Sequence, residues 1–314
     1  MLRTPVRRLL ALTAAVLSVP LLVPAPAHAA PPSYVALGDS YSSGVGTRTY
    51  LNDGTSCQRS VYAFPSLIAA AKGYALNFRA CSGAKVSDVT NTQLSALSAG
   101  TGYVTISVGG NDAGFTSVIT TCAEPAWLSD CKGAVNKAQS YIKNTLPGSL
   151  ATLYSSIRSK APNATVVVVG YPRLFNGEDC NALTWFSPSD ESLLNATADL
   201  LDSKLAAAAA ARGFAFANPT SAFIGHAVCG DPEWLNGLSN PISESYHPNR
   251  VGHASGYTPL VSPLLTGSAL RVNAAVLARA RAQGPALAAQ QRHYAPADRS
   301  IRPERFGTPY AGTR

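Results

Sequence analysis

The chain has 314 residues and a formal net charge of +8, but this charge is concentrated near its ends. Residues 30–266 contain 14 Lys and Arg against 15 Asp and Glu, whereas residues 267–314 contain eight Arg against two acidic residues. The central region therefore lacks the basic face of a nucleic-acid-binding domain, and nothing in it supports nucleic acid as a partner. Its 237 residues are enough for one sizeable hydrophobic core and hardly enough for two.

The first 29 residues have the pattern of a secretory signal peptide. Three arginines precede an apolar stretch at residues 9–23, and Ala27-His28-Ala29 then forms a small-x-small cleavage site. An uncleaved membrane anchor is the alternative, but the apolar stretch is short and prolines interrupt its end. The sequence therefore predicts a secreted, extracellular protein with a signal peptide at residues 1–29.

Five short apolar runs predict buried strands, because they are continuous and are closed by Gly, Pro or Asn. They cover residues 34–37, 74–78, 103–108, 165–169 and 214–217. Helical patterns lie between them at residues 63–72, 133–159 with a break near Pro147, and 188–212. Strands alternating with helices predict a single α/β domain at residues 30–266, a flavodoxin-like three-layer α/β/α fold with a five-stranded parallel sheet.

The first predicted strand runs into Gly38-Asp39-Ser40. A tight turn here presents Ser40 at the carboxyl edge of the sheet, where ligands bind in open α/β folds. Alone, this triplet is better explained as a turn with a solvated hydroxyl. Interpreting Ser40 as a nucleophile therefore requires a base and oxyanion donors elsewhere in the chain.

Three later segments contain these groups. Gly83 follows the second predicted strand, where a glycine lets a backbone N–H face the cleft. Asn111 follows the third, where its side-chain amide can donate to a developing oxyanion. His247 precedes Pro248, which fits the start of a helix and leaves the imidazole in the loop before it. Each segment is weak evidence alone, but four blocks in this order favour a catalytic site.

Six cysteines in an exported chain predict three disulfides. Six cysteines allow 15 connectivities, and the sequence alone does not choose among them. Loop-closure entropy favours neighbours in sequence, and we therefore expect Cys57–Cys81, Cys122–Cys131 and Cys180–Cys229. A structural zinc site is disfavoured because the Cys and His spacing does not fit one.

The last residues, 267–314, form a basic tail rich in Ala and Arg that we expect to be partly disordered. Residues 267–291 predict a helix that breaks at Gly284-Pro285, and residues 295–314 have the composition of a disordered segment. Such a tail either holds the protein near anionic surfaces or is a solvated end without a role.

With its four blocks the chain resembles the SGNH or GDSL hydrolases, named for Ser, Gly, Asn and His in four such blocks. The resemblance spans residues 34–265 and is closest to the secreted bacterial lipases and esterases of the family, which also carry six cysteines. It implies that Ser40 is the nucleophile and His247 the general base. The oxyanion hole would consist of the backbone N–H groups of Ser40 and Gly83 and the side-chain amide of Asn111.

The chain departs from the family pattern at the third member of the triad. Most of the family has an Asp three residues before the histidine, where this chain has Glu244. Either the Glu244 carboxylate orients His247, or a backbone carbonyl of the same turn does so, that of Ser245, as in some secreted relatives. We slightly favour the carbonyl.

The resemblance implies a carboxylic-ester hydrolase, a lipase or esterase that acts on fatty-acyl esters through a serine acyl-enzyme. It implies no metal or organic cofactor. The expected partner is a lipid or another ester substrate, with transient contact with lipid surfaces, and we expect a monomer.

Other functions stay open at this point: a phospholipase or acyltransferase using the same site, or a carbohydrate-ester deacetylase. A non-enzymatic surface-binding module is the least favoured, because a binding module has no use for an oxyanion hole. The α/β-hydrolase pattern does not fit, because Ser40 lacks the second glycine of Gly-x-Ser-x-Gly and lies on the first strand.

Overall fold

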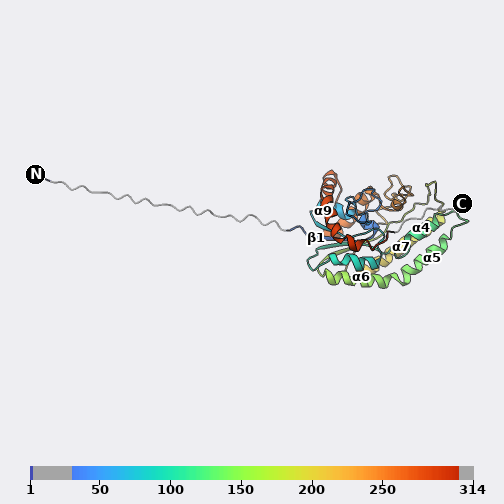
Figure 1. The fold of residues 1–314 in the computed structure, drawn as a ribbon. Helices are drawn as coiled ribbons and strands as arrows, with labels where there is room; N and C mark the ends of the chain where they lie inside the picture. Colours follow the sequence, from blue (N-terminus) through green and yellow to red (C-terminus); the bar gives the residue numbers. More distant parts are fainter. Residues whose placement is uncertain (3–29, 304–314) are drawn as a thin grey trace. The chain divides into compact units, whose positions relative to one another are not determined.

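A parallel sheet of five strands forms the centre of the domain (Figure 1). The computed structural model describes residues 1–2 and 30–303, so nearly all of the predicted signal peptide lies outside the described residues. The strands are β1 (Ser33–Gly38), β2 (Ala75–Phe78), β3 (Tyr103–Ser107), β4 (Thr165–Val169) and β5 (Ala215–Ala217). Their order is β2-β1-β3-β4-β5, which is the flavodoxin-like order, and the predicted α/β fold is confirmed.

Helices cover both faces of this sheet. The longer ones are α2 (Phe64–Lys72), α4 (Phe115–Cys122), α5 (Cys131–Asn144), α6 (Leu146–Lys160), α7 (Pro188–Ala210), α8 (Thr258–Thr266) and α9 (Ala274–Asp298). Two single-turn helices are α1 (Ser40–Ser43) and α3 (Val86–Asp88). Helices α5, α6 and α7 lie on one face, and α9 lies with α2 and α8 on the other (Figure 1).

The ends of the helices follow from local sequence. The predicted break near Pro147 occurs at Thr145, between α5 and α6, and Pro147 lies in the first turn of α6, where a missing N–H costs little. Helix α7 begins at Pro188 and is capped by Ser187, whose hydroxyl accepts from the N–H of Asp190 while the Asp190 carboxylate accepts from the N–H of Ser187.

The three disulfides join Cys57 to Cys81, Cys122 to Cys131 and Cys180 to Cys229, which are the pairs favoured by loop entropy. Each closes an excursion between regular elements. No helix in the described part of the chain is both long and apolar enough to cross a bilayer.

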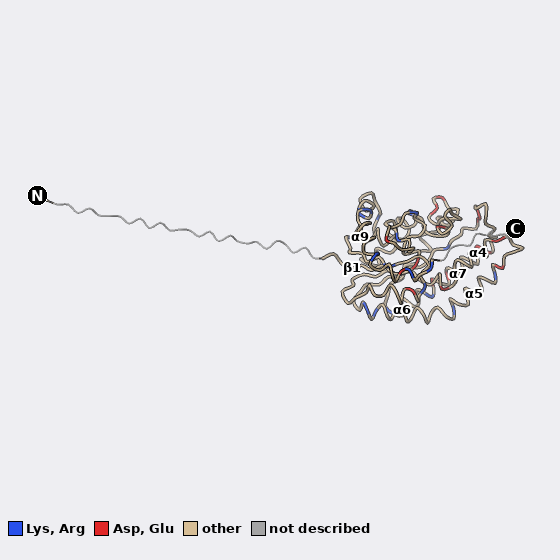
Figure 2. The backbone as a smooth tube through the Cα atoms, viewed as in Figure 1, with Lys and Arg blue, Asp and Glu red and all other residues tan. Residues whose placement is uncertain are grey.

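Figure 2 shows the distribution of charge. Residues 131–160, which form α5 and α6, contain five Lys and Arg and no acidic residue. Residues 267–303, which include α9, contain six Arg and one acidic residue, Asp298, whereas charges of both signs are mixed in the rest of the described domain.

The C-terminal region differs from the sequence-based expectation. The predicted break at Gly284-Pro285 is wrong, because α9 continues through Pro285 to Asp298. A Cβ at Gly284 would lie 3.4 Å from the Val61 side chain, an ordinary contact distance, so α9 packs beside Val61 at this position. Part of the segment predicted to be disordered is also ordered: residues 295–298 are helical, and Ile301 is buried against the Cys57–Cys81 disulfide. Residues 304–314 lie outside the described residues.

Candidate active site

The turn after β1 places Ser40 at the carboxyl edge of the sheet. Gly38 has a φ of 122°, and a Cβ there would lie 2.3 Å from the carbonyl oxygen of Ser107, so only glycine fits. The next residue, Asp39, caps α1 by accepting from the N–H of Tyr41 at 3.1 Å. Ser40 is therefore the first residue of a short helix that starts directly at the strand end.

The Asp39 carboxylate holds this turn to the neighbouring strands. It accepts from the Ser107 hydroxyl at 2.8 Å and from the Tyr171 hydroxyl at 2.5 Å. Burial raises the pKa of Asp39 to about 6, against the lowering effect of these hydrogen bonds. Sequence reasoning missed Tyr171, although it follows β4 just as Ser40 and Asn111 follow their strands, which was a usable signal.

Ser40 and His247 lie in direct contact. The Ser40 hydroxyl is 2.8 Å from Nε2 of His247, and Nδ1 of the same ring is 2.8 Å from the carbonyl oxygen of Ser245. A carbonyl oxygen only accepts, so Nδ1 carries the proton and the lone pair of Nε2 faces the Ser40 hydroxyl. This is the tautomer that a general base for Ser40 needs.

The Glu244 carboxylate forms its hydrogen bonds with groups other than the His247 imidazole. Its carboxylate accepts from the Gly46 N–H at 2.7 Å and from the Tyr50 hydroxyl at 2.5 Å. The residue is buried and ties the loop after α1 to the turn that carries His247. The geometry thus favours the Ser245 carbonyl, rather than the Glu244 carboxylate, as the group that orients the imidazole.

We expect Glu244→Gln to lower kcat/KM less than tenfold. A glutamine can keep its carbonyl on the Gly46 N–H and turn its NH₂ to the Tyr50 oxygen, and the imidazole keeps its Ser245 acceptor. The measurement is hydrolysis of a soluble ester at pH 8. A loss approaching that of Ser40→Ala would show instead that Glu244 completes a triad.

The His247 imidazole is neutral over a wide pH range. Burial lowers the pKa of His247 to about 4, and the hydrogen bond to the Ser245 carbonyl offsets this only in part. A base acts in its neutral form, so lowering its pKa extends activity toward acid pH.

We therefore expect the acid limb of the kcat/KM profile for a soluble ester to have its midpoint below pH 6. Asp39 also titrates in this region, so the profile of Asp39→Asn is the control. A midpoint near the ordinary histidine value of about 6.5 in both proteins would contradict the expectation.

Potential oxyanion donors lie on the segments that follow β1, β2 and β3. The Ser82 and Ala84 amides are paired with backbone carbonyls, whereas the N–H groups of Ser40 and Gly83 donate to no protein group within residues 30–303. Asn111 donates one Nδ2 hydrogen to the Ala84 carbonyl at 3.1 Å. Because an amide NH₂ has two hydrogens, the second is available to a ligand.

A pocket opens beside Ser40 and Asn111 and runs between α4, α5 and α7. Its lining is largely apolar and includes Phe115, Val118, Ile119, Ala138, Ile142, Leu174, Leu194 and Leu201. Such a pocket fits a hydrocarbon chain whose reacting end lies at the serine. In the described residues, His, Cys, Asp and Glu side chains form no group of three or more suited to holding a metal ion.

Comparisons with known proteins agree with this arrangement. Residues 36–255 match the model of the GDSL-like lipase/acylhydrolase family. Lipase 1 of Streptomyces coelicolor is 46% identical over 237 residues, which cover 74% of this chain and 87% of that protein. The crystal structure of an extracellular lipase from Streptomyces rimosus matches with a TM-score of 0.70 and 41% identity, over 74% of this chain and 99% of that one. The crystal structure of a phospholipase A1 from Streptomyces albidoflavus matches with a TM-score of 0.69 and 42% identity, over 74% of this chain and 98% of that one.

Proposed function

This chain belongs to the GDSL-like lipase/acylhydrolase family, and from that premise we propose that it is a secreted ester hydrolase that cleaves fatty-acyl esters through a Ser40 acyl-enzyme. The observation that carries the proposal is the 2.8 Å contact between the Ser40 hydroxyl and Nε2 of His247 at the mouth of an apolar pocket. We expect it to act as a monomer, because one chain supplies all the groups that the chemistry needs.

The reaction follows from the positions of these groups. The Ser40 oxygen attacks the acyl carbonyl while its proton moves to Nε2 of His247, and the Ser245 carbonyl stabilises the imidazolium through Nδ1–H. The resulting oxyanion accepts from the donors at Ser40, Gly83 and Asn111. Nε2 then returns the proton to the leaving alcohol. In the second half, His247 takes a proton from water while the water oxygen attacks the acyl carbon. The bond from this carbon to the Ser40 oxygen then breaks as Nε2 returns the proton to that oxygen, which releases the free acid and restores Ser40.

The ester class is tested with p-nitrophenyl esters from acetate to palmitate, together with phosphatidylcholine. Because the pocket beside Ser40 is apolar, we expect the highest kcat/KM for chains longer than acetate. A clear preference for acetate would support the carbohydrate-ester deacetylase alternative. Absence of hydrolysis of every ester would support a non-enzymatic binding module and defeat the proposal.

Phospholipase activity is the second candidate. The phospholipase A1 of S. albidoflavus and the lipase of S. rimosus match this chain almost equally well, so overall similarity does not separate the head groups. Hydrolysis of phosphatidylcholine in the same panel would indicate phospholipase activity. Adding an alcohol as acceptor tests for acyltransferase activity, because acyl transfer would form the ester of that alcohol.

Export of the protein is part of the proposal. Three disulfides persist in an oxidising compartment, the S. rimosus relative is an extracellular lipase, and residues 1–29 have the pattern of a signal peptide. Mass spectrometry of the secreted protein checks both features: the mature chain should begin near residue 30 and contain no free thiol.

Two neighbouring loops support contact with a lipid surface. Trp127 and Leu128 are 81% and 56% exposed on the loop between α4 and α5, and Leu183 and Trp185 are 63% and 41% exposed on the loop before α7. A hydrogen bond of 3.1 Å from the Trp185 N–H to the Ala123 carbonyl joins the loops. Since α4, α5 and α7 also line the pocket, these side chains can enter a lipid surface that supplies the substrate.

We expect the double variant Trp127→Ser/Trp185→Ser to hydrolyse phosphatidylcholine vesicles about tenfold more slowly, because burying one large apolar side chain is worth about 1.5–3 kcal/mol. Its rate on a soluble butyrate ester should stay unchanged. The matched control is Ile224→Ser, which removes an exposed apolar side chain outside these loops. Equal rates of the double variant and the wild type on vesicles would rule out this docking surface.

A further inference from the structure

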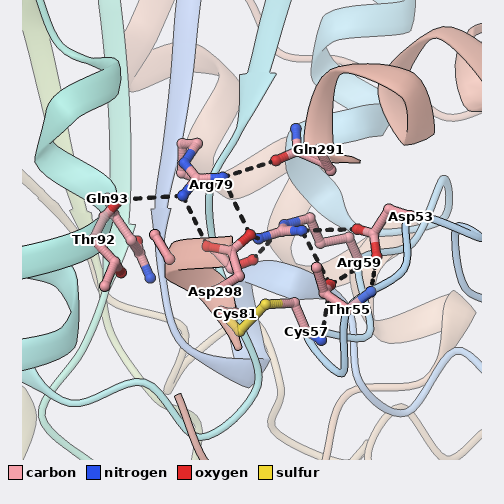
Figure 3. A network of polar contacts seen from close by, with 12 residues as sticks. Asp53, Thr55, Cys57, Arg59, Arg79, Cys81, Thr92, Gln93, Gln291 and Asp298 are labelled. Atoms are coloured by element: carbon pink, nitrogen blue, oxygen red, sulfur yellow. Dashed lines mark hydrogen bonds and ion pairs between the residues drawn. A yellow bond between two sulfur atoms is a disulfide. The ribbon is translucent and has the colours of Figure 1, made fainter. Parts of the chain in front are cut away.

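Helix α9 lies beyond the family match, which ends at residue 255. It packs along α2 and beside β2, an edge strand of the sheet. At its C-terminal end, Gln291 and Asp298 are completely buried and face Arg79 (Figure 3). The Arg79 guanidinium also lies 3.8 Å above the ring of Tyr294. This end of α9 is therefore built around a buried charge of the main domain.

Asp298 joins two arginines that have no exposed surface. Its Oδ2 lies 2.6 Å from Nη2 of Arg59, and its Oδ1 lies 2.8 Å from Nη2 of Arg79 (Figure 3). Asp53 completes the cluster, 2.7 Å from Nη1 of Arg59. Two positive and two negative groups thus balance in the interior. Without Asp298, one buried positive charge would be left uncompensated, which is strongly unfavourable.

Arg59 connects this cluster to the Gly83 loop. Its Nε donates to the carbonyl oxygen of Ala80 at 2.8 Å, directly before Cys81. The disulfide from Cys81 to Cys57 and the 3.0 Å hydrogen bond from the Ser82 N–H to the Cys57 carbonyl fix the next residues. Gly83, an oxyanion donor in the proposed function, follows immediately.

Arg79 connects the cluster to the turn that carries Ser40. Its Nη2 donates to the carbonyl oxygen of Thr92 at 3.1 Å. The next residue, Gln93, clamps both polar groups of Gly38: its Oε1 accepts from the Gly38 N–H at 2.7 Å, and its Nε2 donates to the Gly38 carbonyl at 2.9 Å. Gly38 lies two residues before Ser40, so the clamp fixes the backbone that carries the nucleophile.

We propose that Asp298 is a positioning residue for the ester-hydrolysis site and acts from outside it through the two buried arginines. Its carboxylate fixes both guanidinium groups, and these hold the loop that leads to Gly83 and the segment that clamps the turn before Ser40. Helix α9 is thereby part of the apparatus that aligns the nucleophile with the oxyanion donors. The inference rests on the proposed function, because it assigns Asp298 a role in that reaction.

The acyl pocket lies away from Asp298, so loss of the Asp298 charge should lower kcat and leave KM nearly unchanged. The pocket lies between α4, α5 and α7, whereas α9 and α2 cover the opposite face of the sheet. Loss of the Asp298 charge should therefore misalign the reacting groups without changing how the acyl chain binds. A purely stabilising role of α9 would lower the fraction of folded, active protein and leave the kcat of each active site unchanged, so kcat is expressed per serine titrated with a fluorophosphonate.

The test is Asp298→Asn, which keeps the size of the side chain and removes its charge. We expect kcat for a soluble ester to fall roughly 10- to 100-fold, with KM changed less than about twofold, because small misplacements of reacting groups cost this much. The matched control is Val276→Ala, which loosens α9 at its other end, where Val276 packs on α2, away from the arginines. This variant should lose thermal stability and keep its kcat. An unchanged kcat in Asp298→Asn, or equal losses in both variants, would overturn the proposal.

A charge-balanced double variant covers the case in which Asp298→Asn does not fold. In Arg79→Gln/Asp298→Asn, Arg59 and Asp53 remain as a neutral pair, so stability should recover. The kcat should stay low, because the Thr92 carbonyl has lost its Arg79 donor. Recovery of kcat together with stability would reduce Asp298 to a structural role.

Amide hydrogen exchange provides a measurement that needs no ester turnover. The Gly38 N–H, held by Gln93, should exchange at least tenfold faster in Asp298→Asn than in the wild type and stay protected in Val276→Ala. Unchanged protection at Gly38 would defeat this inference. A wild-type protein inactive on every ester would instead defeat the proposed function, so the two failures are distinguishable.

Discussion

Ser40→Ala is expected to abolish hydrolysis of every ester that the wild-type protein cleaves, with a loss in kcat of at least about 10⁴-fold. The physical reason is that the Ser40 oxygen is the atom that bonds to the substrate in the proposed mechanism, and removing a serine nucleophile costs on the order of 10⁶-fold in a serine protease. Folding should be unaffected, because the hydroxyl contacts His247 and fills little space in the core.

The control for this variant is Ser43→Ala, in the same short helix. Ser43 is buried, and its hydroxyl donates to the Ser40 carbonyl at 3.3 Å rather than to the imidazole. The measurements are kcat for a butyrate ester and covalent labelling by a fluorophosphonate, which should reach Ser40 in the wild type and in Ser43→Ala only. A Ser40→Ala rate within tenfold of wild type would remove the nucleophile from the proposal.

The positions of the strands along the chain and the parallel character of the sheet follow from sequence patterns that are local. A parallel strand covered on both faces must be apolar along its whole length, and Val166 to Val169 of β4 show this plainly. The positions of the proposed catalytic blocks were predictable for a related reason: the carboxyl ends of parallel strands meet at one edge, so residues that follow different strands come together. Ser40 and Asn111 were found in this way.

Other features depend on contacts that the local sequence does not encode. Helix α4 escaped prediction because Phe115–Cys122 is rich in Thr, Val and Ile, which have low helix propensity, and tertiary packing overrides this preference. Helix α9 was expected to stop at Gly284-Pro285, because this dipeptide usually breaks a helix. The sequence did not show that it continues, because the anchors beyond the break, Asp298 and Ile301, have partners more than 200 residues earlier in the chain. Glu244 carries a carboxylate, as a triad acid must, but this carboxylate accepts from the N–H of Gly46, a partner 198 residues away that the local sequence does not reveal.

Asn111→Ala is expected to lower kcat roughly 10²- to 10³-fold with little change in KM, the effect of losing one oxyanion donor. The donor acts on charge that exists only in the transition state, so binding of the ground-state ester should hardly change. The structure supports this role because one Nδ2 hydrogen of Asn111 is fixed on the Ala84 carbonyl, which orients the amide before substrate arrives. The measurement is steady-state hydrolysis of a butyrate ester.

The alternative is that Asn111 only braces the loop of Ala84, and a second asparagine separates the two roles. Asn195 bonds both the N–H and the carbonyl of Phe175 away from the nucleophile, so Asn195→Ala should lose stability and keep its kcat. Affinity for a trifluoromethyl ketone, which forms a tetrahedral oxyanion on Ser40, should fall in Asn111→Ala in parallel with kcat and stay unchanged in Asn195→Ala. If inhibitor affinity in Asn111→Ala equals that of the wild type, the Asn111 amide does not bind the oxyanion.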